Sequence, residues 1–193
     1  EAAKYGVDAG APVTDWTRVK AHVRGAIETI APVDSQERFE GMGVTVIREA
    51  ARFADRKTIV SDSVRVTAKR IIIATGSRAF IPPIEGLASL PFLTNEAIFD
   101  LPDFPSHLIV LGGGPIGLEM AQAFRRLGAA VTVIEMGRVL ARADAGHAAI
   151  AADALRKEGV TLLEGHKALR VSGTQGALTV HVRKDDAETT VTG

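Results

Sequence analysis

A glycine-rich turn between two apolar segments constrains this chain more than any other feature. Residues 107–135 read HLIVLGGGPIGLEMAQAFRRLGAAVTVIE and contain Gly112-x-Gly114-x-x-Gly117. Gly112 permits a tight turn, Gly114 lets a pyrophosphate approach the main chain because it has no Cβ, and Gly117 lets a helix pack closely on the preceding strand. A glycine pattern alone is weak support, but here a strand precedes it, a helix follows it and an acid ends the next strand. This combination predicts a dinucleotide-binding βαβ unit.

The segments around this turn have the composition that a parallel α/β unit requires. The aliphatic run Leu108–Leu111 predicts a strand that is buried on both faces. Pro115–Leu127 predicts a helix, since proline is tolerated in a first turn and Gly128 follows the last helical residue. The free N–H groups and the dipole of this helix would face the phosphates. Ala130–Glu135 predicts the second parallel strand.

Glu135, at the end of that second strand, bears on which dinucleotide is bound. A carboxylate at this position accepts hydrogen bonds from the adenosine ribose hydroxyls and repels a 2′-phosphate, which favours NAD over NADP. Arg138 acts in the opposite direction, because a nearby guanidinium can bind a 2′-phosphate. NADP therefore remains an alternative.

Composition and charge narrow the class of protein. The 193 residues are 46% hydrophobic and 24% charged, which is ordinary for a soluble globular protein. Lys+Arg and Asp+Glu both total 23, so we expect neither a nucleic-acid partner nor a membrane partner. No apolar run approaches the ~18 residues of a spanning helix, and the start EAAKYGVDAG lacks the features of a signal peptide. The expected location is the cytoplasm.

Cysteine and histidine usage limits the chemistry that these residues can perform. The chain contains no cysteine, which excludes disulfides, thiolate metal sites and cysteine catalysis within it. The histidines are scattered and show no HxxxH or HExxH spacing, so we expect no metal site. They are His22, His107, His147, His166 and His181.

The N-terminal half predicts a helix followed by short strands. Thr14 is the expected N-cap, and Trp16 is expected to pack in a core rather than stack on a ligand. Pro32 breaks the helix, after which Asp34 or Ser35 can cap a short continuation. The apolar face of the helix comprises Trp16, Val19, Val23, Ile27 and Ile30. An antiparallel meander is then expected at Val44–Arg48, Ala50–Ala54, Thr58–Val60 and Val64–Thr67.

A second informative segment, Arg70–Ser77, reads RIIIATGS and predicts an apolar strand that ends in a turn of small residues. By itself such a turn is an ordinary strand exit. Small residues at the carboxyl end of a buried strand also let a ligand touch the main chain, and the position ahead of the dinucleotide unit favours this second interpretation. Residues 78–106 hold five prolines and one helix-like piece, Asn95–Phe99, and they predict a domain junction.

After Glu135 the pattern continues a doubly wound domain. Asp144 is the expected cap of a helix that runs to about Glu158, and Val160–Leu163 is the expected third parallel strand. A second meander is expected at Leu169–Ser172, Ala177–Arg183 and Glu188–Thr192. In a complete doubly wound domain, a further parallel strand is expected beside Leu108–Leu111. Without that strand, Leu108–Leu111 has an unpaired edge.

This order of elements resembles the FAD-dependent pyridine nucleotide–disulfide oxidoreductases, in particular the mercuric-reductase-like and dihydrolipoamide-dehydrogenase-like members. Besides the glycine turn, the supporting stretches are residues 34–39, 49–53, 72–77 with Pro82-Pro83, and 94–96. The resemblance covers essentially the whole chain. It implies an α/β fold with a Rossmann-like NAD(P)-binding domain and its antiparallel meander at residues 86–193. The C-terminal part of a similar FAD-binding domain would precede it at residues 1–85, and both domains would be incomplete.

The resemblance also implies roles for single residues. The expected contacts of the nicotinamide dinucleotide are Gly112, Gly114, Ile116, Gly117, Glu119 and Glu135. The expected contacts of FAD are Ala51, Thr75, Gly76 and Ser77. Glu119 resembles a helix glutamate that lies near the nicotinamide and the flavin, although the helix dipole alone also favours an acid early in a helix. No catalytic residue is expected within these 193 residues.

The chain departs from the family in what it lacks. The first FAD-binding GxGxxG, the CxxxxC redox pair, the last nucleotide-domain strand, the C-terminal dimerisation domain and an initiator Met are all absent. We therefore expect a central fragment, inactive alone and poor at binding FAD. The parent flavoenzyme would be a homodimer that passes hydride from NAD(P)H to FAD and on to a disulfide or metal-ion acceptor, or to another acceptor if it has no cysteine pair. The alternative is a non-enzymatic dinucleotide-sensing Rossmann module.

Overall fold

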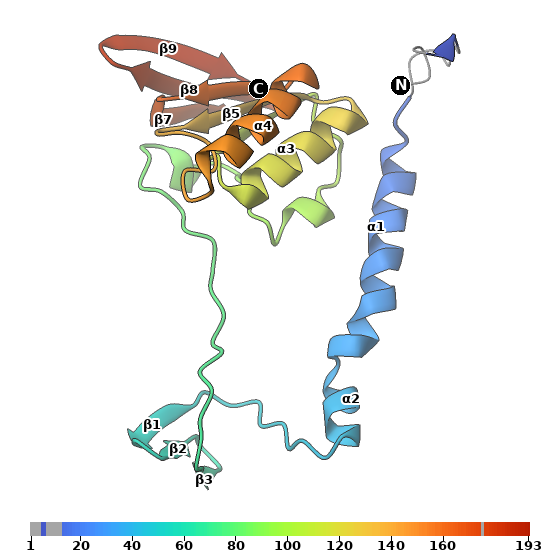
Figure 1. Ribbon diagram of the computed structural model, residues 1–193, viewed down its shortest axis with the longest axis vertical. Coiled ribbons are helices and arrows are strands. Elements are labelled where there is room, and N and C mark those ends of the chain that lie inside the picture. The colour runs from blue at the N-terminus through green and yellow to red at the C-terminus, as the bar shows by residue number, and fades with distance from the viewer. Residues whose placement is uncertain (1–4, 7–12, 175) are drawn as a thin grey trace. The chain divides into compact units, whose positions relative to one another are not determined.

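The computed structural model describes residues 5–6, 13–174 and 176–193, and it divides into two compact units. The larger unit contains the chain up to Lys20 together with Phe80–Gly193, and the smaller unit is Ala21–Ala79 (Figure 1). The absence of a signal peptide was expected from residues 1–10, most of which lie outside the described residues. The predicted domain boundary at residue 85 stays a prediction.

A parallel sheet with two crossover helices forms the centre of the larger unit. Its strands are β4 (His107–Leu111), β5 (Ala130–Glu135) and β6 (Thr161–Glu164), in the order β4-β5-β6. Helix α3 (Pro115–Leu127) connects β4 to β5, and α4 (Ala145–Lys157) connects β5 to β6. The predicted βαβαβ order is therefore confirmed. Because β4 has one neighbour in this sheet, the unpaired edge expected for it is present among the described residues.

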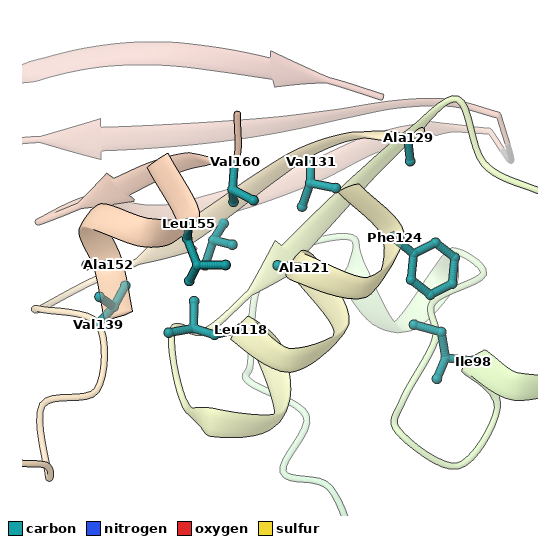
Figure 2. Close-up of a cluster of buried hydrophobic side chains, with 11 residues drawn as sticks. Ile98, Leu118, Ala121, Phe124, Ala129, Val131, Val139, Ala152, Leu155 and Val160 are labelled. Carbon is teal, nitrogen blue, oxygen red and sulfur yellow. The ribbon is translucent and has the colours of Figure 1, made fainter. Parts of the chain in front are cut away.

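Helices α3 and α4 cover one face of the parallel sheet and enclose the larger of two hydrophobic clusters. This cluster contains Leu118, Ala121 and Phe124 of α3 together with Val131 of the sheet and Leu155 of α4, all labelled in Figure 2. These side chains are buried because apolar positions recur at helical spacing in α3 and α4 and at every second residue in β5. This cluster holds the strand that ends at Glu135 in a fixed position relative to α3.

The opposite face of the parallel sheet packs against an antiparallel meander. This meander consists of β7 (Lys167–Thr174), β8 (Ala177–Lys184) and β9 (Ala187–Thr192), as the alternating sequence predicts. Ile134 points to this side, opposite to its neighbour Val133, and joins Val180 and Val182 in the second cluster. Because β5 is covered on both faces, its four successive residues Val131–Ile134 are all buried.

The first turn of α1 (Trp16–Ile30) belongs to the larger unit and is anchored there by an aromatic group. The ring of Trp16 lies 5.3 Å from that of Phe104 and 5.8 Å from that of Phe124, centroid to centroid, and its indole N–H donates to the Leu101 carbonyl at 3.1 Å. The expected core-packing role of Trp16 is confirmed. The remainder of α1, from residue 21 onward, contributes no buried residue.

The predicted N-cap of α1 is wrong by one residue. Asp15, directly before the helix, accepts a hydrogen bond from the backbone N–H of Arg18 at 3.1 Å through its carboxylate, which is the geometry of an N-cap. The hydroxyl of Thr14 instead donates to the Leu127 carbonyl at the end of α3. Thr14 thus ties this segment to the larger unit rather than capping its own helix.

The smaller unit contains short elements and little core. After a 3-10 helix, η2 (Ala31–Asp34), Ser35 caps α2 (Gln36–Gly41) through a hydrogen bond from Arg38 N–H at 3.2 Å, as one of the two predicted caps. A three-stranded antiparallel sheet then follows, formed by β1 (Arg52–Asp55), β2 (Thr58–Val60) and β3 (Arg65–Thr67). Thr58 is the sole buried residue among residues 21–79, all of which the structure describes.

Two predicted strands and one predicted helical piece did not form as expected. Val44–Arg48 and Arg70–Ser77 are irregular, and Ile72 is 91% exposed. A strand needs a neighbour that completes its hydrogen-bond ladder, and within residues 21–79 the sheet β1-β2-β3 leaves both segments unpaired. Within the proline-rich segment, η3 (Leu87–Ser89) is a 3-10 helix that the prediction missed. The helix predicted at Asn95–Phe99 is instead η4 (Ile98–Asp100), another 3-10 helix.

Candidate dinucleotide site

The glycine turn joins β4 to α3, and each of its three predicted glycines has its own geometric reason. Gly112 has a φ of +108° and donates its N–H to the Ile134 carbonyl at 2.9 Å, so it ends the β4–β5 ladder in a left-handed conformation. Gly114 is the N-cap of α3, and a Cβ added to it would meet open space. A Cβ on Gly117 would overlap the Gly112 carbonyl oxygen. The geometry supports the predicted role of each glycine, and their contact with a nucleotide stays a prediction.

Gly113 is a fourth essential glycine that the sequence reasoning missed. It is buried, and a Cβ on it would lie 2.6 Å from Val139 Cγ1. Its carbonyl accepts a hydrogen bond from the Leu140 N–H at 2.9 Å. The middle residue of Gly-x-Gly therefore has to be small here, because the side chain of Val139 packs directly on it. Val139 lies 26 residues after Gly113 in the sequence.

Glu135 fastens the glycine turn to the carboxyl end of the sheet. Its Oε2 accepts from Gly113 N–H at 2.8 Å, and its Oε1 accepts from Gly137 N–H at 2.7 Å. The carboxylate thus bridges the turn after β4 and the loop after β5. A carboxylate has about four lone-pair sites, so capacity remains for ribose hydroxyls. The predicted ribose contact of Glu135 stays a prediction, but its fixed position beside the turn supports it.

Glu164, at the end of β6, is a second acid at this edge that the sequence reasoning missed. It is paired in register with Glu135 on the neighbouring strand. Its Oε1 accepts from Val139 N–H at 2.8 Å, and its Oε2 pairs with Arg156 at 2.5 Å. The available signal was the position of an acid at the end of the third parallel strand, matching Glu135 at the end of the second.

The remaining dinucleotide candidates lie on the exposed side of α3 and in the loop that follows β5. Ile116 and Glu119 are exposed in the first two turns of α3, and Arg138 is exposed in the loop after β5. The first-turn N–H groups of Ile116 and Gly117 precede the helical hydrogen-bond pattern and therefore have no carbonyl partner within the helix. They remain free to donate to an anion at the helix N-terminus.

The FAD candidates lie in two separate segments of the smaller unit. Thr75, Gly76 and Ser77 are exposed in an irregular segment, where Gly76 has a φ of +69°. Ala51 directly precedes β1 and lines a shallow hollow with Glu49 and Ser61. The contact of these residues with FAD stays a prediction.

The carboxylate of Glu49, beside Ala51, is held in its charged form by serine residues. Hydrogen bonds from the side chains of Ser61 and Ser63 and from the Ser63 backbone lower the pKa of Glu49 to about 2. The Ser63 N–H donates to Glu49 Oε2 at 3.0 Å. These contacts brace the turn between β2 and β3 against the segment that carries Ala51.

Searches for two other kinds of site gave no candidate in the part of the chain that the structure describes. No group of three or more His, Cys, Asp or Glu side chains within residues 5–6, 13–174 and 176–193 could hold a metal ion. Over the same residues, none of the helices combines the length and the apolar character needed to cross a bilayer.

Comparisons with known proteins identify a family that this chain resembles over nearly its whole length. A sequence model for the family described as pyridine nucleotide-disulphide oxidoreductase matches residues 13–192. The mercuric reductase of Acidithiobacillus ferrooxidans is 30% identical over 177 residues, which cover 89% of this chain and 32% of that protein. The glutathione reductase of Burkholderia cepacia is 32% identical over 188 residues, which cover 97% of this chain and 41% of that protein.

Solved structures show the same likeness. The Cu(II) complex of the HOCl-induced flavoprotein disulfide reductase RclA from Escherichia coli superposes with a TM-score of 0.74 at 26% identity. The match covers 92% of this chain and 41% of that chain. This chain therefore spans less than half the length of each of these proteins.

Proposed function

This chain belongs to the pyridine nucleotide-disulphide oxidoreductase family, and we propose that it supplies the nicotinamide dinucleotide site of a flavoprotein oxidoreductase. Membership of this family implies FAD and a nicotinamide cofactor. The observation that carries the proposal is the glycine turn, which Glu135 fixes at the carboxyl end of β5 while the space over Gly114 stays open. When bound, the nicotinamide cofactor supplies a hydride and FAD accepts it.

The residues of the turn bind and orient the dinucleotide. The pyrophosphate lies over Gly114, where no Cβ obstructs the main chain, and accepts hydrogen bonds from the free N–H groups of Ile116 and Gly117. The dipole of α3 stabilises its negative charge. Glu119, further along the exposed side of α3, lies toward the nicotinamide and the flavin.

NAD is the proposed cofactor in preference to NADP. Glu135 already holds two loop amides, so its carboxylate stays at the site where the adenosine ribose would lie. Negative charge fixed at that place repels a 2′-phosphate. Arg138 is the group that could reverse this preference, since it lies three residues after Glu135, in the loop that follows β5.

The rest of the proposal rests on the family. The FAD contacts are Ala51, Thr75, Gly76 and Ser77, and the electrons pass from FAD to a disulfide or a metal ion. Because the 193 residues contain no cysteine, this chain is proposed not to reduce a disulfide by itself. The whole protein is proposed to act as a homodimer in the cytoplasm.

Titration of the chain with NADH tests the proposed site. NADH is expected to bind saturably and more tightly than NADPH. Gly114→Val is expected to abolish binding without unfolding the chain, because the position has open space and an ordinary φ of −75°. Gly25→Val, at an open position in α1, is the matched control and should bind like the unchanged chain.

Three results would contradict this proposal. If the unchanged chain binds neither dinucleotide, the proposed site is wrong. Folded Gly114→Val with undiminished affinity would show that the pyrophosphate lies elsewhere. Absence of flavin absorbance in a purified protein that contains this whole chain would favour a dinucleotide-sensing module over an oxidoreductase.

A further inference from the structure

We infer that Glu164 is a positioning residue for the dinucleotide site, acting through the loop of residues 136–140. This inference rests on the proposed function, because it concerns the same glycine turn. Glu164 lies at the end of β6 and is separated from the turn by that loop. Its effect on the nucleotide is therefore indirect, and it passes through two contacts of the loop with Gly113.

Glu164 holds the 136–140 loop through its carboxylate. Oε1 accepts from the Val139 N–H at 2.8 Å, while Oε2 is paired with Arg156 of α4 at 2.5 Å. The side chain of Glu164 is 27% exposed, so water competes with these contacts less than at an open surface. Because Arg156 fixes the carboxylate from the other side, Glu164 keeps one orientation toward the loop.

The loop in turn contacts Gly113 through the side chain of Val139 and the backbone of Leu140. Val139 is buried in the helix-covered cluster, as Figure 2 shows, and its side chain occupies the space where a Cβ of Gly113 would lie. The Leu140 N–H donates to the Gly113 carbonyl at 2.9 Å. Leu140 does so at a φ of +52°, which a leucine rarely adopts and which surrounding contacts must maintain.

The remaining contacts of the loop do not bond the Val139 backbone. At the end of the loop, the Leu140 carbonyl accepts a hydrogen bond from the Ala143 N–H at 2.8 Å. Gly137 donates its N–H to Glu135 and accepts from Gly165 N–H at 2.9 Å. These contacts fix the exit from β5, whereas Glu164 alone among the described side chains bonds the Val139 backbone. Loss of the Glu164 carboxylate would remove one restraint on the strained residue Leu140, and Gly113, which Glu135 also holds, would be less firmly positioned.

Calorimetric titration of the whole 193-residue chain with NADH tests this inference. Glu164→Ala is expected to raise the dissociation constant about tenfold, the size of effect that one charge-assisted hydrogen bond has. Glu164→Gln keeps an oxygen for Val139 N–H and is expected to restore affinity to within about threefold of the unchanged chain. Glu188→Ala removes an exposed acid of the meander, which pairs with Arg183 at 4.0 Å, and should leave affinity unchanged.

Hydrogen exchange gives a second readout that general stability does not move. In Glu164→Ala the amide of Leu140 should exchange faster, while amides of β5 keep their rates. If Glu164→Ala does not fold, Glu164→Asp decides the question, since its side chain is too short to reach Val139 while Arg156 holds it. Weaker NADH binding by a folded Glu164→Asp supports the inference.

The possible failures are distinguishable. If the unchanged chain does not bind NADH, the proposed function and this inference both fall. If the unchanged chain binds NADH and Glu164→Ala or Glu164→Asp binds equally well, only the inference is overturned. Equal losses in Glu164→Ala and Glu164→Gln also overturn it, because charge would then matter rather than the hydrogen bond to the loop.

Discussion

At the end of β5, the two carboxylate oxygens of Glu135 accept hydrogen bonds from two different loops, Oε2 from Gly113 and Oε1 from Gly137. The same carboxylate is the proposed ribose acceptor, so replacing it changes both the position of the turn and the choice of cofactor. Glu135→Ala is expected to raise the dissociation constant for NADH by about tenfold or more, since at least one charge-assisted hydrogen bond is lost. It should also relax discrimination against NADPH.

Glu135→Gln separates these two effects. The amide oxygen can still accept from one loop, but the negative charge that repels a 2′-phosphate is gone. The ratio of the NADPH and NADH dissociation constants should therefore move toward one in both variants, with the smaller loss of NADH affinity in Glu135→Gln. A preference of the unchanged chain for NADPH would contradict the role proposed for Glu135.

Single-residue roles were predictable from the sequence where they depend on local geometry. Gly112 and Gly117 follow from a turn whose residues lie next to one another in the chain. Gly113, Val139 and Glu164 were missed because their importance comes from contacts between residues that are far apart in the sequence. A glycine pattern leaves its x position open, and only the packing of Val139 on Gly113 shows that this position must be small.

Among the elements, α4 separates a packed face from an exposed face within one helix. Leu155 is 5% exposed in the helix-covered cluster, whereas Ile150 of the same helix is 70% exposed. Leu155→Ala is expected to lower the free energy of unfolding by about 2–5 kcal/mol, because it removes buried methyl groups and leaves a cavity. Ile150→Ala is the matched control and should change it by less than about 0.5 kcal/mol. Urea denaturation of both variants measures this, and similar losses would contradict the assigned faces.

The C-terminal ends of α3 and α4 are joined by Glu158, and this contact makes a pH-dependent contribution. The hydrogen bond from Arg126, at 2.7 Å to Oε2, and that from Gln122 lower the pKa of Glu158 below its ordinary value of 4.5. A carboxyl with a lowered pKa in the folded state stabilises the protein above its ordinary pKa, and this stabilisation is lost as the pH falls through the folded pKa.

The difference in unfolding free energy between the unchanged chain and Glu158→Gln should therefore be positive at pH 7 and shrink below pH 4.5. It should be small throughout, and smaller at high salt, because the Arg126 side chain is exposed to water. Denaturation at a series of pH values measures it. A difference that grows as the pH falls would mean that Glu158 is not held in its charged form.

Whether a predicted element formed depended on whether its packing partners lie within the same unit. Strands β4 and β5 and helices α3 and α4 were predicted correctly, and each packs on the others. Arg70–Ser77 contains three consecutive isoleucines, yet it is irregular because no strand in the smaller unit pairs with it. Apolar composition favours a buried strand, but whether the strand forms also depends on a neighbouring strand that pairs with it and buries it.

For the molecule as a whole, the two units differ in how much they bury. The larger unit has two hydrophobic clusters, one on each face of its parallel sheet. Within the fully described residues 21–79, Thr58 is the one buried residue, while apolar side chains such as Ile72 and Phe53 are exposed. Since hydrophobic burial is the dominant favourable term in folding, the larger unit should carry nearly all of the stability.

Hydrogen exchange of the backbone amides should therefore divide at the boundary between the units. Amides of β4 and β5 are expected to open only with global unfolding, whereas those of β1, β2 and β3 should open at a cost within about 1–2 kcal/mol of zero. The antiparallel strands β7 and β8 serve as the internal control, because they have the same kind of ladder as β1 and β2 but lie on a buried cluster. Strong protection in β7 and β8 with weak protection in β1 and β2 would show that burial, rather than strand pairing, sets the difference. Equal protection of the two meanders would mean that the smaller unit gains stability from contacts beyond its own core.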